Sequence, residues 1–244
     1  MFSFRASADP AELAFTDRLG GVSAVPFDSL NLAFEGEDDP AAVRQNLHLL
    51  LDEFAPGDEL CDLHQVHGDR VAVVDEAGPV SRPDADALVT RQPGVVLMVR
   101  AADCVPVLFV APEVAAIGAA HCGRLGLVSG VVLRTVEQLR GWGATTVHAW
   151  VGPHVCGGCY EVPAEMQDEV SAVVPESLAT TSRGTPSLDL GAGVRAQLEA
   201  AAVTVHDVSR CTRESPDLYS HRRDGTKAGR QAGLVRLRQV GDPL

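Results

Sequence analysis

The alternation of apolar and polar positions divides the chain into strand-like and helix-like segments. Short Val-, Leu- and Ala-rich runs that end at Gly, Asp or Pro are typical of buried strands, whereas apolar residues three and four positions apart indicate helices. The pattern predicts strands at residues 13–17, 61–66, 70–74, 95–100, 105–110, 115–120, 147–151, 203–208 and 234–240. It predicts helices at residues 41–54, 125–140, 164–174 and 193–202.

The order of these segments indicates the fold class. Strands and helices are mixed without strict alternation, which favours an α/β or mixed α+β fold with a large mixed β-sheet. No internal repeat, low-complexity stretch or long linker interrupts the 244 residues. We therefore expect a single layered domain over residues 1–244.

Composition and charge narrow the class of function. The chain is 45% apolar but only 5% aromatic, so its core must consist mainly of Val, Leu and Ala. Twenty basic and thirty-three acidic residues give a net charge of −13. This balance argues against non-specific binding to nucleic acid or an anionic membrane, because both need a basic face. A local arginine cluster can still bind a small phosphate-bearing substrate.

The N-terminal segment and the cysteines indicate a compartment. We see no signal-peptide pattern and no apolar stretch long enough to span a bilayer, so we expect a cytoplasmic protein. In that reducing compartment the six cysteines are expected to be thiols or metal ligands rather than disulfides.

Three residues in separate motifs suggest a metal site. His67 lies in Leu-His-Gln-Val-His-Gly, Cys104 in Ala-Ala-Asp-Cys-Val-Pro and His121 in Gly-Ala-Ala-His-Cys-Gly. Each follows an apolar run and precedes a turn-like stretch. Two imidazoles and one thiolate suit a zinc ion with one open position, which is typical of a catalytic centre. Spacing alone does not distinguish this set from a buried Cys and two satisfied His side chains.

Other residues compete for these roles. His64 would share a strand face with His67, so the pattern cannot choose between them. Cys122 competes with Cys104, but on an extended segment it points away from its neighbour His121. A separate Cys-Gly-Gly-Cys motif at residues 156–159 is either a redox pair or a glycine turn with two incidental cysteines.

Two polar segments are candidate anion or substrate sites. Arg222, Arg223 and Arg230 lie within nine positions, and guanidinium groups match phosphate oxygens well, although a solvated loop would look the same. Arg18 lies beside two glycines, and Asn31 lies between two leucines. Asn31 is either a buried amide that reads a ligand or a turn residue that bonds its own backbone.

Taken together, the motifs cover nearly the whole chain. They are Thr16-Asp-Arg-Leu-Gly-Gly-Val-Ser23, Ser29-Leu-Asn-Leu32, Gln65-Val-His-Gly68, Asp84-Ala-Asp-Ala87, Ala102-Asp-Cys-Val-Pro106, Ala120-His-Cys-Gly123, Gly152-Pro153, Tyr160-Glu-Val162, Leu188-Asp-Leu190, Cys211-Thr-Arg213 and Tyr219-Ser-His-Arg-Arg-Asp-Gly225. This combination resembles the YfiH-type laccase-domain family, regarded as multifunctional purine nucleoside phosphorylases. The resemblance implies a layered mixed α/β fold related to cysteine-dependent deamidase toxins. It also implies that His67, Cys104 and His121 bind zinc.

The chemistry implied by the resemblance is phosphorolysis of adenosine, inosine and methylthioadenosine, together with deamination of adenosine. One metal would serve both reactions, by activating water and by polarising phosphate or a substrate oxygen. Asp103 is the nearest acid–base candidate in sequence, with Asp84 and Asp86 behind it. The candidate substrate and phosphate ligands are Arg18, Asn31, Arg222, Arg223 and Arg230.

One segment departs from the family pattern. The family usually reads Ala-His-Ala-Gly-Trp-Arg-Gly, whereas this chain has Arg124 in place of the tryptophan and Leu125 in place of the arginine. We expect Arg124 to supply the missing charge from the adjacent position.

Three other functions fit parts of the sequence. A His₂Cys set with an axial Met suits a copper polyphenol oxidase, although eight His and three Met are few for a multicopper cluster. Cys104 could act as a nucleophile with His121 as its base, which would make the protein a cysteine hydrolase. A non-enzymatic nucleoside-binding protein is the third alternative. The sequence leaves the oligomeric state open between a monomer and a small homo-oligomer.

Overall fold

The computed structural model describes residues 1–75 and 82–239 and contains two mixed β-sheets. The five-stranded sheet has the order β1 (Phe2–Ala8), β2 (Ala11–Thr16), β13 (Gln231–Leu237), β6 (Val95–Ala101) and β3 (Glu59–Cys61). The six-stranded sheet has the order β12 (Thr204–Asp207), β9 (His148–Val151), β7 (Val105–Ala111), β8 (Ala116–Cys122), β5 (Ala87–Thr90) and β4 (Val71–Val74). The predicted mixed α/β class is confirmed, with the strands divided between two sheets.

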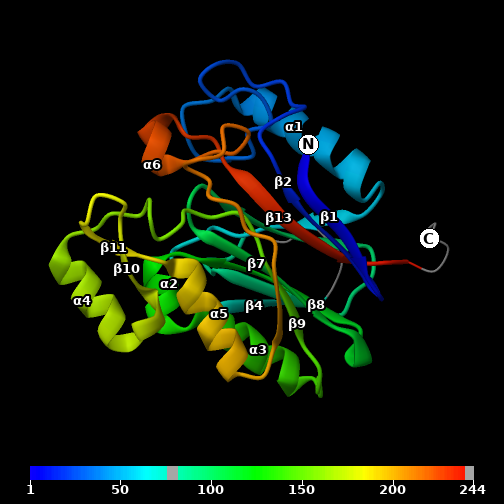
Figure 1. Cartoon of the computed structure of the whole chain (residues 1–244). Helices are drawn as coiled ribbons and strands as arrows, with labels where there is room; N and C mark the ends of the chain where they lie inside the picture. Colours follow the sequence, from blue (N-terminus) through cyan, green and yellow to red (C-terminus); the bar gives the residue numbers. More distant parts are fainter. Residues whose placement is uncertain (76–81, 240–244) are drawn as a thin grey trace.

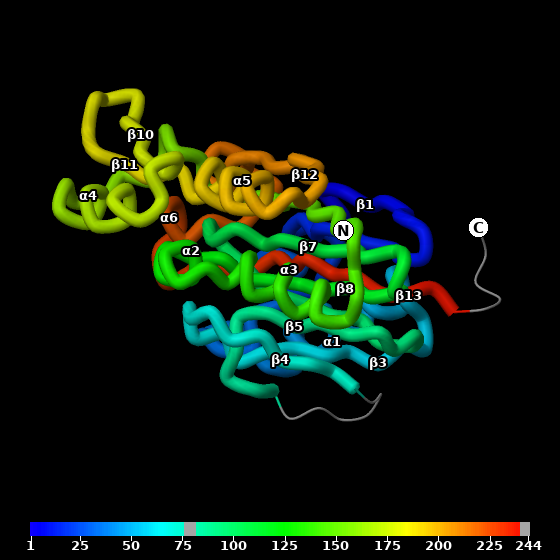
Figure 2. Tube along the Cα trace, turned by 90° about the horizontal axis from the view of Figure 1, so that it is seen from below, coloured from blue at the N-terminus to red at the C-terminus, as the bar shows by residue number. Residues whose placement is uncertain are grey.

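Helices cover the outer faces of the two sheets. They are α1 (Pro40–Phe54), α2 (Arg124–Ser129), α3 (Val131–Gly141), α4 (Ala164–Val173), α5 (Leu190–Ala200) and α6 (His221–Asp224), with 3₁₀ turns at η1 (Pro112–Val114), η2 (Pro175–Ser177) and η3 (Gly225–Lys227). Figure 1 shows α1 on one side of the sheets and α3 and α5 on the other. The β10 (Leu178–Thr180) and β11 (Pro186–Leu188) hairpin lies with α4 at one end of the molecule (Figure 2).

The period-two alternation of side chains explains these layers. In β6, Leu97 and Val99 lie in the core between the two sheets, whereas Val96 and Met98 pack in the core beneath α1. Strand β7 alternates in the same way between the inter-sheet core and the core beneath α3 and α5. Both faces of these strands are therefore buried, so their sequences read as continuous apolar runs rather than alternating ones.

Several predicted elements differ from those observed. The strand predicted at 61–66 is wrong beyond Cys61, where β3 ends and an irregular loop begins. The helix predicted at 125–140 is broken at Gly130, which has a φ of 82°. This residue ends α2, and α3 begins at Val131. Strand β8 continues through His121, so this residue lies within a strand and not after it. The last predicted strand begins earlier, at Gln231, and its final position, Val240, lies outside the described residues.

The apolar pattern also missed some elements. Strands β5, β10 and β11 and the short helix α6 were not predicted, because each has only three or four residues. Strand β1 was also missed, although Phe2, Phe4, Ala6 and Ala8 alternate with polar residues. None of the helices over residues 1–75 and 82–239 combines the length and the apolar character that a bilayer crossing requires.

Candidate metal centre and substrate cavity

The three predicted ligands meet at the floor of a cavity of about 480 Å³. The ligand atoms of His67, Cys104 and His121 all lie within 4.8 Å of one another. His67 Nε2 lies 4.0 Å from Cys104 Sγ, and the two imidazole rings meet edge to face with centroids 4.8 Å apart. His67 is exposed, Cys104 is half-buried and His121 is buried, and all three line the cavity.

Asp86 holds two of these residues in place. Its Oδ1 lies 2.9 Å from His121 Nδ1 and accepts a hydrogen bond of 2.9 Å from the His67 amide. Its Oδ2 accepts from the amides of Val66 and Gly68 at 3.2 and 2.6 Å. The carboxylate therefore fixes the 66–68 turn and leaves Nε2 of His121 to face the cavity, which is the usual arrangement behind a metal-binding histidine.

The backbone beside the three ligands is constrained at His67, Asp103 and Gly123. His67 and Asp103 have φ values of 61° and 87°, which lie in the left-handed region that few side chains adopt. At Gly123, a Cβ atom would lie 2.8 Å from His67 Cδ2 and 3.2 Å from Cys104 Sγ. Glycine at residue 123 is therefore required for the turn to pass so close to two of the three ligands.

The charges of the group favour a thiolate. Burial raises the pKa of Cys104, but attraction to His121 outweighs it and lowers that pKa to about 6. Burial lowers the pKa of His121, yet the negative charges of Cys104 and Asp86 raise it to about 9. Without a metal the pair is thus a thiolate and an imidazolium at neutral pH. A bound divalent ion must displace the imidazolium proton, so affinity rises with pH in this range.

The competing residues lie elsewhere. His64 Nδ1 lies 2.7 Å from Asp84 Oδ1 on the surface, and the group of ligand atoms contains His67 instead. Cys122 is buried in the core, and burial raises the pKa of its thiol. The prediction that adjacent cysteine and histidine side chains point apart is confirmed.

The carboxylate of Asp103 lines the cavity but is already hydrogen-bonded. Its Oδ1 accepts from the Thr212 hydroxyl at 2.6 Å, and its Oδ2 accepts from the Arg222 amide at 2.6 Å. These bonds connect the corner between β6 and β7 to the loop at Thr212 and to the first turn of α6. The structure therefore gives Asp103 a positioning role, while its acid–base role stays a prediction.

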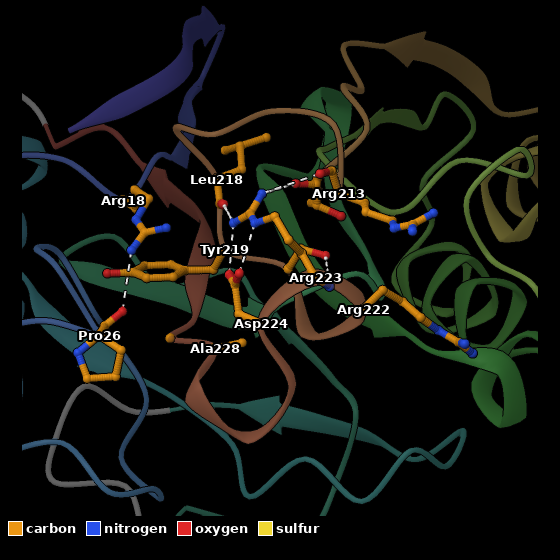
Figure 3. Close-up of polar contacts among 12 residues, drawn as sticks. Arg18, Pro26, Arg213, Leu218, Tyr219, Arg222, Arg223, Asp224 and Ala228 are labelled. Atoms are coloured by element: carbon orange, nitrogen blue, oxygen red, sulfur yellow. Dashed lines mark hydrogen bonds and ion pairs between the residues drawn. The ribbon is translucent and has the colours of Figure 1, made fainter.

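The predicted arginines have different roles. Arg222 and Arg230 line the cavity, and the Arg222 guanidinium lies 4.6 Å from the centre of the Tyr160 ring. Arg223 instead donates to the carbonyls of Thr212, Ser215 and Leu218, at 3.0, 3.0 and 2.6 Å. Figure 3 shows Arg223 turned into its own loop and Arg222 extended away from it.

Arg18 and Asn31 are not among the residues that line the described cavity. Arg18 lies 4.7 Å from the centre of the Tyr219 ring and donates to the Pro26 carbonyl at 3.4 Å (Figure 3). It also donates to the Asp28 carbonyl at 2.6 Å. Asn31 is buried, and its Oδ1 accepts from the Arg230 amide at 2.9 Å. Both residues hold the loops beneath the cavity in the structure described, so direct contact with substrate stays a prediction for each.

Comparison with known proteins places this arrangement in a family. Residues 12–238 match the family model described as multi-copper polyphenol oxidoreductase laccase. The chain belongs to this family. A Streptomyces coelicolor relative named purine nucleoside phosphorylase is 48% identical over 244 residues, covering 97% of this chain and 100% of that protein.

Two crystal structures show the same fold. YlmD from Geobacillus stearothermophilus has a TM-score of 0.86 and 31% identity, covering 98% of this chain and 99% of that chain. The hypothetical protein YfiH from Bacillus licheniformis has a TM-score of 0.84 and 27% identity, with 93% of each chain covered. The resemblance to the YfiH-type laccase-domain family is confirmed.

Sequence reasoning missed one wall of this laccase-domain cavity. The Phe34 ring lies 4.6 Å from the Arg82 guanidinium and 4.4 Å from that of Arg100. Both arginines pair with Asp62, at 3.0 and 2.8 Å. Burial lowers the pKa of Arg100 to about 10, so it stays charged at neutral pH. The available clue was Arg100 itself, since a charge at the end of an apolar strand needs a partner.

The departure from the laccase-domain pattern lies at the start of α2. Leu125 is exposed. Burial raises the pKa of the Tyr160 phenol, and the positive charge of Arg124 opposes part of that rise. Tyr160 lines the cavity. Neither Arg124 nor Leu125 is among the residues that line the described cavity, so the replacement of the family's arginine by Arg124 stays a prediction.

The donor set fits a metal, and the residues around it bear on which one. The three ligand atoms lie within 4.8 Å of one another. They would have to move closer together for an ion between them to reach Zn–N and Zn–S distances of about 2.0 and 2.3 Å. A blue-copper site would add a long axial Met ligand. Met1, Met98 and Met166 are not among the described residues that line the cavity.

Proposed function

We propose that this laccase-domain protein is a zinc-dependent purine nucleoside phosphorylase with adenosine deaminase activity. The observation that carries the proposal is the placement of the metal-ligand group and two arginines, Arg222 and Arg230, around one cavity. The volume of about 480 Å³ lies within the range of small-molecule sites. The name of the Streptomyces coelicolor relative supports the same reaction class.

His67, Cys104 and His121 would hold the zinc ion. When bound, zinc polarises an oxygen ligand and lowers the pKa of water, which suits both phosphorolysis and deamination. Asp86 fixes the tautomer and orientation of His121 before any substrate arrives.

Other cavity residues would bind the phosphate and position the nucleoside. The Arg222 guanidinium contacts the Tyr160 ring at the cavity wall, and we assign the phosphate subsite to this wall. Arg230 adds a second positive charge, and Arg124 adds a third from the start of α2. Asp103 would position Arg222 by accepting a hydrogen bond from its amide, and Arg223 would hold the loop before α6 by donating to the Thr212 carbonyl.

Chromatography of adenosine incubated with the purified protein tests the proposal. We expect phosphate-dependent release of adenine, and phosphate-independent formation of inosine. Zinc-loaded protein that forms neither product would overturn the proposal. Inosine and methylthioadenosine serve as further substrates, because each releases its base only by the phosphorylase route.

A further inference from the structure

A second group of metal-ligating side chains lies outside the cavity ligands. The ligand atoms of Cys156, Cys159, Cys211 and Glu214 all lie within 4.8 Å of one another. Cys159 Sγ lies 3.5 Å from a Glu214 carboxylate oxygen, and the Cys156 amide donates to Cys211 Sγ at 3.5 Å. All three cysteines are free thiols. This group includes both cysteines of the Cys-Gly-Gly-Cys motif.

The backbone brings the two loops of this group together. His154 and Cys211 form a parallel bridge, in which the His154 amide donates to the Arg210 carbonyl and the Thr212 amide donates to the His154 carbonyl. The Cys159 amide donates to the Cys156 carbonyl at 2.9 Å and closes a tight turn. The thiols are therefore placed by main-chain hydrogen bonds and not by flexible side chains alone.

Packing fixes the same turn from below. A Cβ atom at Gly157 would lie 2.9 Å from the Asp189 Cβ and 3.0 Å from the Ala179 Cβ. Only glycine fits there without displacing backbone, so residues 156–159 are held against the start of α5. A preformed ligand set needs this kind of support.

We propose that Cys156, Cys159, Cys211 and Glu214 form a second metal site, structural in role, which binds zinc or another thiophilic divalent transition ion. Three thiolates and a carboxylate supply four ligands, so they complete a tetrahedral shell and leave no open position. Soft sulfur ligands select such ions over magnesium or calcium. The Cys-x₂-Cys spacing of residues 156–159 is typical of one half of a structural zinc site, and Cys211 and Glu214 repeat the same spacing with a carboxylate as the second ligand.

Basic residues lie near this site, but burial favours protonated thiols. Arg183, Arg213 and Arg222 line a surface hollow together with Cys159 and Glu161. Burial raises the pKa of Cys156 to about 12 and also raises that of Cys159, although Arg213 opposes the rise at Cys159. An arriving ion would therefore displace thiol protons.

The second site would join two walls of the substrate cavity. Cys159 precedes Tyr160, which lines the cavity, and Cys211 precedes Thr212, which donates to Asp103 beside Cys104. An ion at the second site would therefore hold these walls together from outside the cavity. Its role does not depend on the reaction that the cavity carries out.

A Cys104→Ser variant loaded with cobalt tests the proposal without altering the second group. We expect an intense near-ultraviolet thiolate-to-cobalt absorption, because the remaining sulfur ligands belong to Cys156, Cys159 and Cys211. The band should disappear in the Cys104→Ser/Cys156→Ser/Cys211→Ser variant. A cobalt-treated Cys104→Ser protein with no such band would overturn the proposal.

Metal content of the wild-type protein, measured by mass spectrometry, gives a second readout. We expect two zinc equivalents per chain, and one in the Cys156→Ser/Cys211→Ser variant. Glu161→Gln is the matched carboxylate control, since Glu161 lines the same hollow but lies outside the ligand group, and it should keep both equivalents. One equivalent in the wild type after loading with excess zinc, with none released by the double substitution, contradicts a second site.

Discussion

The two ligand groups of this protein differ in where their side chains come from and in how many there are. His67, Cys104 and His121 come from a turn, a strand corner and a strand, and they surround a cavity from one side. Cys156, Cys159, Cys211 and Glu214 come from two adjacent loops and face one another. Three ligands leave one position of a tetrahedral ion open, whereas four ligands fill it. This difference separates a centre suited to catalysis from one suited to stability.

Loss of Cys104 should have the largest effect. A Cys104→Ala variant removes the only thiolate from the open group, so we expect loss of its zinc equivalent and of both activities. Because metal polarisation contributes several kcal/mol, the rates should fall by about a hundredfold to a thousandfold or more. Metal analysis and the adenosine assay measure both losses. Full activity in a variant without zinc at this site would refute the scheme.

The cysteine-hydrolase alternative makes the opposite prediction for alkylation. A zinc-ligated thiolate should be protected from iodoacetamide when zinc is in excess, whereas a free nucleophile with a pKa of about 6 should be labelled quickly. Peptide mapping of Cys104 after brief treatment distinguishes the two. Labelling that zinc does not slow would favour the nucleophile.

Asp86 should set the affinity of the open group. An Asp86→Asn variant weakens the hold on His121, so we expect zinc affinity to fall by about 10- to 100-fold. Competition with a chelator measures the change. Asp84→Asn is the matched control, because Asp84 contacts the exposed His64, and its affinity should match that of the wild type. Equal losses in both variants would mean that Asp86 has no special role.

Substitutions of Arg222 and Arg223 should have different effects, one on phosphate binding and the other on the free energy of unfolding. An Arg222→Ala variant should raise KM for phosphate by about tenfold or more, the value of one charged hydrogen bond, with little change in Tm. An Arg223→Ala variant should instead lower the free energy of unfolding by about 2–3 kcal/mol, because several carbonyls lose their donor. Phosphate kinetics and thermal denaturation on both variants test this division. The reverse pattern would reassign the phosphate subsite.

The smallest effect concerns the loop that carries Cys211. Arg210 donates two hydrogen bonds to Asp217, at 2.8 and 2.7 Å, and so holds the pKa of Asp217 below its usual value. A depressed carboxyl pKa contributes stability above the usual value of 3.8, and this is lost as the pH falls through the folded-state pKa. Arg210→Gln should therefore cost about 0.5 kcal/mol at pH 7, less in high salt, and nothing in strong acid. Denaturation curves at several pH values measure the difference.

The sequence predicted the reactive residues better than their supports. The residue pattern made His67, Cys104 and His121 candidates, and the family resemblance selected them from their competitors. The structure places their ligand atoms within 4.8 Å of one another. The sequence ranked Asp86 below Asp103 as an acid–base candidate and did not indicate that it supports the ligands. That role depends on the register of β5 against β8 and on the position of the 66–68 turn. Those contacts are long-range, and no local pattern encodes them.

The arginines show the same limit. Arg222 and Arg223 are adjacent and chemically identical, so composition cannot tell which one lines the cavity. The choice depends on the helical turn of α6, which directs one side chain to Tyr160 and the other to the carbonyls of its own loop. The apolar pattern also predicted one helix across Gly130, because a left-handed residue does not interrupt a periodic stripe.

One oxygen atom, Asp86 Oδ1, contacts both the amide of His67 and the ring of His121. The backbone of the 66–68 turn and the ring of His121 therefore share one anchor, whereas the His67 imidazole can still turn about its own side-chain bonds. A change at this single atom would disturb the supports of two of the three ligands together.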